Sequence, residues 1–246
     1  MSGIPNWPGC KPPRPAPARG FTLLESLVTM AVLGGLIVVV FAVFRVGATG
    51  FKVGTDQLDL QGDLRRLMAP LRKDLQNTSF QSTSFVSQSL SVPARPPNLN
   101  PTVTVQRDGL SMNGLLQPEA SDSYDKDSGL PIWDCYLCYF VTLDQPDGKL
   151  VRMVLKDPSR DVLSRPLNLG PGDLSSSNGN LIQNNLRVLS DQMMDFGVTL
   201  DQSNQLVRLH LRLRSKVGHQ MMGGRSLVEI LEIQTTINPA NTNPRL

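Results

Sequence analysis

Apolar residues follow one another almost without interruption from Phe21 to Phe44. At about 1.5 Å per residue, a helix of this length spans about 36 Å, enough to cross a hydrocarbon core of about 30 Å. A single carboxylate, Glu25, lies within the run. Because a charged group is costly in hydrocarbon, its presence there indicates a function that involves a partner. The pattern therefore predicts a transmembrane helix with one functional acid.

The pattern changes after this run. Three glycines between positions 45 and 54 each lower helix stability by about 0.8–1 kcal/mol relative to alanine, so we expect a soft, partly helical segment there. From 56 to 76 apolar residues recur at helical spacing, with Thr55 or Asp56 as the expected amino-terminal cap. The apolar face that this spacing predicts consists of Leu60, Leu64, Leu67, Met68, Leu71 and Leu75.

The remainder of the chain alternates short apolar stretches with turn-forming residues, which is typical of strands. Two hairpins are predicted, Ile132–Leu143 with Lys149–Lys156 and Asp195–Leu200 with Leu206–Arg214. Other strands are expected at Phe85–Val92, Thr102–Gln106, Gly109–Met112 and Leu227–Ile237, the last with a bulge between Ile230 and Leu231. A helix followed by hairpins predicts an α+β fold with a mainly antiparallel sheet.

Residues 1–20 form a basic, proline-rich leader that differs from a secretory signal, because its charged segment precedes an apolar segment that is retained. The leader contains Lys11, Arg14 and Arg19, whereas Arg45 alone lies close on the other side of the span. This bias places the leader in the cytoplasm and the carboxyl-terminal part across the membrane. Without the leader, 21 basic side chains balance 21 acidic ones, which argues against bulk electrostatic binding of nucleic acid.

Positions 19–28 read Arg-Gly-Phe-Thr-Leu-Leu-Glu-Ser-Leu-Val, and this run resembles the processing signature of type IV pilins and type II secretion pseudopilins. The resemblance covers residues 19–45, and residues 63–76 are similar to J-type minor pseudopilins and PilW-like minor pilins. It implies a pilin-like fold, in which a long helix has a transmembrane half and an amphipathic half that packs on the sheet. It also implies cleavage between Gly20 and Phe21 by a prepilin peptidase and N-methylation of Phe21.

Glu25 fits this resemblance in physical terms. Cleavage would leave an α-ammonium group on Phe21, and Glu25 of a neighbouring subunit could neutralise it in a filament. Removing one partner of such a buried pair typically costs about 3–5 kcal/mol, so the pair would fix the register between subunits. The alternative is that Glu25 simply extends to the membrane interface from the first turn of the helix.

Cys135 and Cys138 are the only cysteines left after the predicted processing, and they form a Cys-x-x-Cys sequence. An oxidising compartment favours a disulfide between them. Residues three apart in a regular strand point to opposite faces, however, so two unbonded thiols are the alternative. Asp122, Asp125 and Asp127 lack the spacing of a calcium-binding loop and are expected to be solvated.

Basic and apolar residues alternate between positions 207 and 214, which predicts a strand with one apolar and one basic face. The basic face consists of Arg208, His210, Arg212 and Arg214. The basic face is expected to be solvated or to pair with an acidic neighbour. A DNA-uptake tip subunit that contacts phosphate through the three arginines is an alternative, weakened by the lack of interleaved aromatic residues. We expect no enzymatic activity, cofactor or metal, because no catalytic motif is present; an extracytoplasmic enzyme anchored by a pilin-type helix is a further alternative.

These observations predict a leader at 1–20, a transmembrane helix at 21–44, a soft segment and amphipathic helix at 45–78 and a β-rich head at 79–246. The expected function is that of a minor pilin or pseudopilin, assembled near the tip of a type II secretion pseudopilus or type IV pilus. Expected partners are prepilin peptidase, other pilin-like subunits, the inner-membrane assembly platform and membrane lipid. The expected location is the cytoplasmic membrane, crossed once, with a periplasmic head, and the filament after assembly.

Overall fold

The computed structural model describes residues 22–95, 98–163, 165–170, 186–215, 219–220, 226–227 and 230–239. The predicted leader and the predicted cleavage junction at Gly20 and Phe21 lie outside these ranges. The chain divides into two compact units, Met1–Ala48 and Thr49–Leu246, and each is described by itself.

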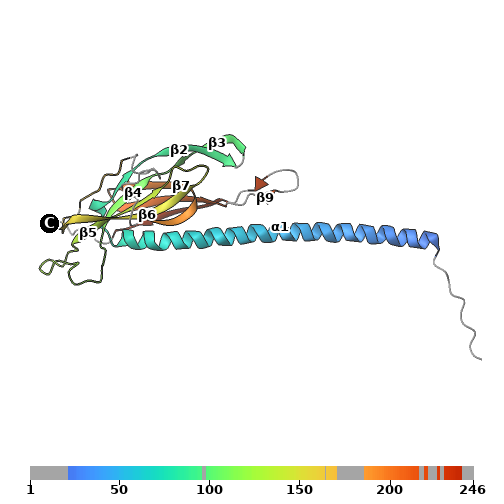
Figure 1. The fold of residues 1–246 in the computed structure, drawn as a ribbon, viewed down its shortest axis with the longest axis horizontal. Coiled ribbons are helices and arrows are strands. Elements are labelled where there is room, and N and C mark those ends of the chain that lie inside the picture. The colour runs from blue at the N-terminus through green and yellow to red at the C-terminus, as the bar shows by residue number, and fades with distance from the viewer. Residues whose placement is uncertain are drawn as a thin grey trace, which may run out of the picture. The chain divides into compact units, whose positions relative to one another are not determined.

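Helix α1 is continuous from Leu23 to Gln76 (Figure 1). The expected soft segment between 45 and 54 is helical throughout, and Pro70 lies inside the helix rather than at its end. The prediction that Thr55 or Asp56 caps a second helix is therefore wrong. Thr55 instead donates a hydrogen bond from its hydroxyl group to the Phe51 carbonyl oxygen one turn earlier, at 3.0 Å.

The part of α1 that belongs to the second unit packs along a sheet through one apolar face (Figure 1). Five leucines of the predicted face are buried and Met68 is partly buried against them, so this prediction is confirmed. The buried leucines are Leu60, Leu64, Leu67, Leu71 and Leu75. Their spacing of three and four residues places them on one side of the helix, which explains why this side faces the core.

The described strands form one large antiparallel sheet of seven strands and two small hairpins. In spatial order, the large sheet consists of β1 (Ser84–Val86), β4 (Gly109–Gly114), β5 (Trp133–Val141), β6 (Gly148–Asp161), β7 (Leu186–Asp201), β8 (Leu206–Arg214) and β11 (Ile230–Ile237). The small pairs are β2 (Ser89–Arg95) with β3 (Asn98–Gln106), and β9 (His219–Gln220) with β10 (Ser226–Leu227). A short 3-10 helix, η1 (Phe80–Ser82), connects α1 to β1. The predicted α+β class is confirmed.

Both predicted hairpins are present, as β5–β6 and β7–β8, although β7 begins earlier than expected. The single strand expected at Phe85–Val92 is wrong, because the chain there forms β1 of the large sheet and β2 of a small hairpin. The bulge expected at Ile230 is also wrong, since β11 pairs with β8 in regular register from Ile230 to Ile237.

The large sheet has apolar residues on both faces. The leucines of α1 pack against one face, where alternate residues of β8 such as Leu209 and Leu211 are buried. On the other face, Phe140 and Met153 form a second cluster. The β2–β3 hairpin adds a third cluster with Met194 of β7. Around β5 and β6 the sheet is therefore buried on both sides, whereas β8 has one apolar and one polar face.

Candidate assembly site and charged sites of the head

Helix α1 begins with reciprocal hydrogen bonds between Thr22 and Glu25. The backbone N–H of Glu25 donates to Thr22 Oγ1 at 3.3 Å, and the backbone N–H of Thr22 donates to Glu25 Oε2 at 3.4 Å. The Thr22 hydroxyl group also donates to Glu25 Oε2, at 3.3 Å. This arrangement is a capping box, which satisfies backbone donors that a helix start would otherwise leave unpaired.

The capping box gives Glu25 a role within a single copy of the chain. Its carboxylate accepts a hydrogen bond from the backbone of the residue directly after Phe21. The predicted ion pair with the Phe21 ammonium of a neighbouring subunit stays a prediction, because Gly20 and Phe21 lie outside the described residues. The sequence analysis missed this capping box, although the Thr-x-x-Glu spacing is a signal that could have identified it.

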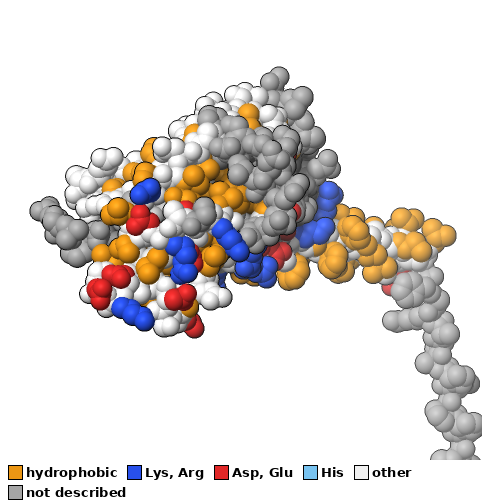
Figure 2. Space-filling model, turned by 60° about the vertical axis from the view of Figure 1, so that its left-hand side comes forward, with side chains coloured by type: hydrophobic (Ala, Val, Ile, Leu, Met, Phe, Trp, Pro, Cys, Tyr) orange, Lys and Arg blue, Asp and Glu red, His pale blue; other side chains and the backbone are white. Residues whose placement is uncertain are grey.

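All side chains of α1 from Leu23 to Ala48 are exposed, and most of them are apolar. Hydrophobic side chains are correspondingly prominent on the visible surface of the helix (Figure 2). In the part of the chain that the structure describes, α1 is the one helix long and apolar enough to cross a membrane. An exposed apolar surface of this length is suited to contact with lipid or with other apolar helices.

Strand β5 places Cys135 and Cys138 in different apolar clusters, and both cysteines are buried and form no disulfide. Of the two alternatives, the structure agrees with two separate thiols and not with a disulfide, because a regular strand directs these side chains to opposite faces. Burial raises the pKa of the Cys135 thiol to about 12, and the neighbouring Asp134 carboxylate adds to this effect. A thiol with so high a pKa is a poor nucleophile at neutral pH, which argues for a packing role.

The predicted basic face of β8 is largely neutralised by carboxylates of the adjacent strands β7 and β11. The nitrogen–oxygen pairs are Arg208 with Asp201 at 2.7 Å, His210 with Glu232 at 2.8 Å and Arg212 with Asp195 at 3.7 Å. This face therefore lacks the excess of positive charge that a phosphate-binding surface needs.

Arg214 does not lie on a solvated face, and its predicted place in a basic row is wrong. Its side chain is 0% exposed because the β2–β3 hairpin covers this end of β8. It donates from Nε to Asp147 Oδ1 and from Nη1 to the Pro93 carbonyl oxygen, both at 2.8 Å. Burial raises the pKa of Asp147, and the hydrogen bond from Arg214 opposes this rise. The pair connects the β5–β6 turn to β8 and to the small hairpin.

A second buried arginine, Arg107, also bonds to the β5–β6 turn. It donates to the carbonyl oxygens of Thr142 at 2.6 Å and Pro146 at 3.1 Å. Burial lowers the pKa of Arg107, although Asp147 and Asp144 counteract the effect. Sequence reasoning missed this role, because a lone arginine between two strands has no local pattern that identifies its partners.

A further network connects α1 to the sheet. Both the Tyr139 hydroxyl group, at 2.5 Å, and Arg152 Nε, at 2.7 Å, donate to Asp74 Oδ2. The three residues come from α1, β5 and β6, and they lie at the edge of the leucine face. Burial raises the pKa of Tyr139, and the Asp74 carboxylate reinforces the shift. The network therefore holds the end of the helix in a fixed position on the sheet.

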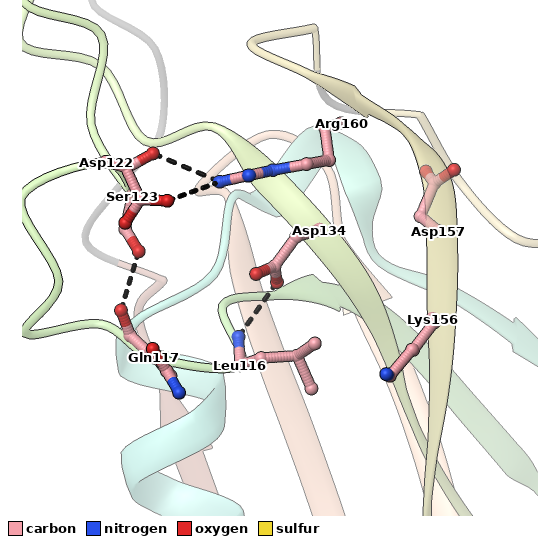
Figure 3. Close-up of a pocket in the computed structure, with 8 residues that line it drawn as sticks. All are labelled: Leu116, Gln117, Asp122, Ser123, Asp134, Lys156, Asp157 and Arg160. Atoms are coloured by element: carbon pink, nitrogen blue, oxygen red, sulfur yellow. Dashed lines mark hydrogen bonds and ion pairs between the residues drawn. The ribbon is translucent and has the colours of Figure 1, made fainter.

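A hollow of about 660 Å³ lies between the loop at 115–132 and strands β5 and β6 (Figure 3). On one side, Arg160 Nη2 donates to the Asp122 carbonyl oxygen at 3.1 Å and lies 3.5 Å from its carboxylate. On the floor, Asp134 accepts a hydrogen bond from the backbone N–H of Leu116 at 2.8 Å. These groups hold the loop to the sheet.

The acidic residues of this loop also bond within it. Asp125 accepts hydrogen bonds from the backbone N–H of Ser128 at 3.0 Å and from the Ser128 hydroxyl group. These bonds lower the pKa of Asp125. Asp122 and Asp127 are exposed. Within the described ranges, no three histidine, cysteine or acidic side chains gather closely enough to hold a metal ion.

Comparison of the chain with protein-family models, with curated proteins and with solved structures finds no match. Proposals about function therefore depend on the residues and geometry of this chain.

Proposed function

We propose that this chain is a minor pilin or minor pseudopilin, anchored in the cytoplasmic membrane and then assembled near the tip of a filament. The observation that carries the proposal is the position of the Gly-Phe-Thr-Leu-Leu-Glu sequence at 20–25. Helix α1 begins within this sequence, at Leu23. The first part of the helix is exposed and apolar, and its later part packs on an antiparallel sheet. No observation favours the DNA-binding or enzymatic alternatives.

Processing would change the chemistry at the helix start. Hydrolysis of the bond between Gly20 and Phe21 leaves a carboxylate on the leader and an α-ammonium group on Phe21. Glu25 already accepts a hydrogen bond from the next backbone N–H, so its carboxylate lies close in sequence to this new charge. In the membrane the two groups can compensate each other within one subunit. In a filament the same carboxylate can accept the ammonium of a neighbour, which excludes water and fixes the register.

The exposed apolar part of α1 supports assembly as well as anchoring. Lipid covers it before assembly, and the equivalent helices of neighbouring subunits can cover it afterwards. Gly34 and Gly35 lie in this part, and a Cβ atom added at either glycine would meet nothing within 4 Å among the described residues. Small residues allow helices to approach closely in such an apolar environment.

The first experiment determines the mature amino terminus by mass spectrometry in cells that contain a prepilin peptidase. We expect a chain that begins at Phe21 and carries one methyl group. A matched strain without the peptidase should retain Met1 and the leader. Recovery of an intact leader in the peptidase-containing strain would overturn the proposal.

Two substitutions separate the helix-capping role of Glu25 from its assembly role. Glu25→Gln keeps an acceptor oxygen for the capping box but removes the charge, whereas Thr22→Val removes the cap and keeps the charge. We expect Glu25→Gln to be processed but excluded from filaments, and Thr22→Val to be processed and incorporated. Incorporation is measured by immunoblotting of sheared filaments. The opposite result would show that Glu25 acts only as a helix cap.

A further inference from the structure

The loop between β4 and β5, residues 115–132, is long and lacks regular structure, but it is fixed by many hydrogen bonds. Two of these are Leu116 N–H to Asp134 at 2.8 Å and Ile132 N–H to the Ser123 carbonyl oxygen at 2.9 Å. The Ser123 hydroxyl group donates to the Gln117 carbonyl oxygen at 2.6 Å. A loop of this length in a compact domain is commonly functional when it is held in place.

Besides the hollow of Figure 3, this loop lines a second cavity, of about 380 Å³. The last turns of α1 and strands β5, β6 and β7 complete its wall. Pro70, Leu115 and Leu137 make part of this wall apolar. Two large side chains of the loop border the cavity and remain exposed, Leu116 at 44% and Tyr124 at 42%. Fixed, exposed apolar side chains at the mouth of a cavity are typical of a docking surface.

The charges around this cavity are unbalanced. Four charged side chains line it: Lys73, Asp74, Arg152 and Arg187. Asp74 and Arg152 form an ion pair at 2.7 Å and compensate each other. Lys73 and Arg187 are exposed, and neither has an ion-pair partner among the described residues. The cavity therefore combines an apolar wall with two uncompensated cations from different elements.

We propose that this cavity is a docking site for an acidic peptide segment of a partner protein. An apolar side chain of the peptide enters the cavity between Leu116, Leu137 and Pro70. A neighbouring carboxylate lies between Lys73 and Arg187, and Tyr124 packs against the peptide at the rim. Charge complementarity selects an acidic partner, because Asp74 already pairs with Arg152 and the two remaining cations would repel a basic segment. The site does not depend on the function proposed above, since its residues all belong to the head and the adjoining end of α1.

The test uses the full chain in phosphatidylcholine nanodiscs and a fluorescein-labelled peptide, Gly-Leu-Glu-Gly-Leu-Glu-Gly, observed by fluorescence anisotropy. We expect saturable binding, and about tenfold weaker binding of the counterpart with glutamine in place of glutamate. Lys73→Glu and Arg187→Glu should each weaken binding of the acidic peptide about tenfold. Tyr124→Ala should weaken both peptides by a similar factor, because it removes apolar contact.

Lys156→Glu is the matched control. Lys156 is also exposed, and it lines the hollow of Figure 3 rather than the proposed docking cavity. This variant should bind the acidic peptide as the unmodified protein does. Fluorescence of the buried Trp133 shows whether each variant is folded.

Three results would overturn the proposal. One is the absence of saturable binding by the unmodified protein. Another is an equal loss of binding in Lys156→Glu, which would indicate general electrostatic attraction. The third is displacement of the peptide by an oligothymidylate of equal charge, which would identify a nucleic-acid surface instead.

Discussion

The two halves of α1 share one helical backbone but differ in what surrounds their side chains. Before Thr49 every described side chain is exposed, and Leu33 is 56% exposed. After Thr49 a periodic row of leucines faces the sheet, and Leu71 is 0% exposed. Composition also differs, since the first half is apolar on all sides and the second has one apolar face.

The two halves of this helix are therefore suited to different surroundings. The later half is specified by this chain's own sheet, so its leucines follow a 3.6-residue period. The earlier half has no periodic face, which is the pattern expected of a helix surrounded by lipid or by other apolar helices. A helix that is apolar all around and exposed in a single chain therefore indicates partners outside the chain.

The largest expected difference between the two halves comes from replacing one leucine with alanine in each half. We expect Leu71→Ala to lower the free energy of unfolding of the head by about 2–5 kcal/mol, because it leaves a cavity in the core. Leu33→Ala should leave it nearly unchanged. The measurement is chemical denaturation of the processed protein in micelles, followed by fluorescence of Trp133, since the other tryptophan, Trp7, lies in the predicted leader. Equal losses in both variants would contradict the division of the helix.

A smaller effect is expected at the polar edge of the later half. Asp74→Ala leaves Arg152 and the Tyr139 hydroxyl group without their acceptor and should lower stability by about 1–3 kcal/mol. The value lies below that of a fully buried pair because the Arg152 side chain is 25% exposed. The control is Asp63→Ala, which removes a pair with the exposed Arg66 and should cost about 0.5 kcal/mol or less. Indistinguishable losses in the two variants would show that Asp74 does not hold the helix.

Local patterns in the sequence were sufficient for much of the fold. The spacing of Leu60 to Leu75 identified the buried face of the helix, and turn residues between apolar stretches identified both hairpins. These features depend on periodicities of 3.6 and 2 residues, which a single sequence displays directly. The absence of a disulfide between Cys135 and Cys138 also follows from strand geometry, and it was one of two alternatives that the sequence left open.

Features that depend on contacts distant in sequence could not be predicted. Alternation placed Arg214 on a polar face, but the β2–β3 hairpin covers that position and supplies the Pro93 carbonyl oxygen. The pairing of Asp74 with Arg152 joins residues on different elements, and no local rule relates them. The capping box at Glu25 differs from these cases, because its spacing is local and predictable.

The smallest predicted effect lies where the two halves meet. Gly50 was expected to soften the helix but is helical, and a Cβ atom there would meet nothing within 4 Å. We therefore expect Gly50→Ala to stabilise the helix locally by about 0.8–1 kcal/mol, which slows amide hydrogen exchange around residues 45–55 about fivefold.

The matched control is Gly62→Ala, where a Cβ atom is equally free of contacts but the sheet already limits opening. Its exchange should change less, because opening there requires separation of the leucine face from the core. If amide hydrogen exchange slowed equally in both variants, the helix around Gly62 would open without separating from the sheet. The two halves would then not differ in the way described above.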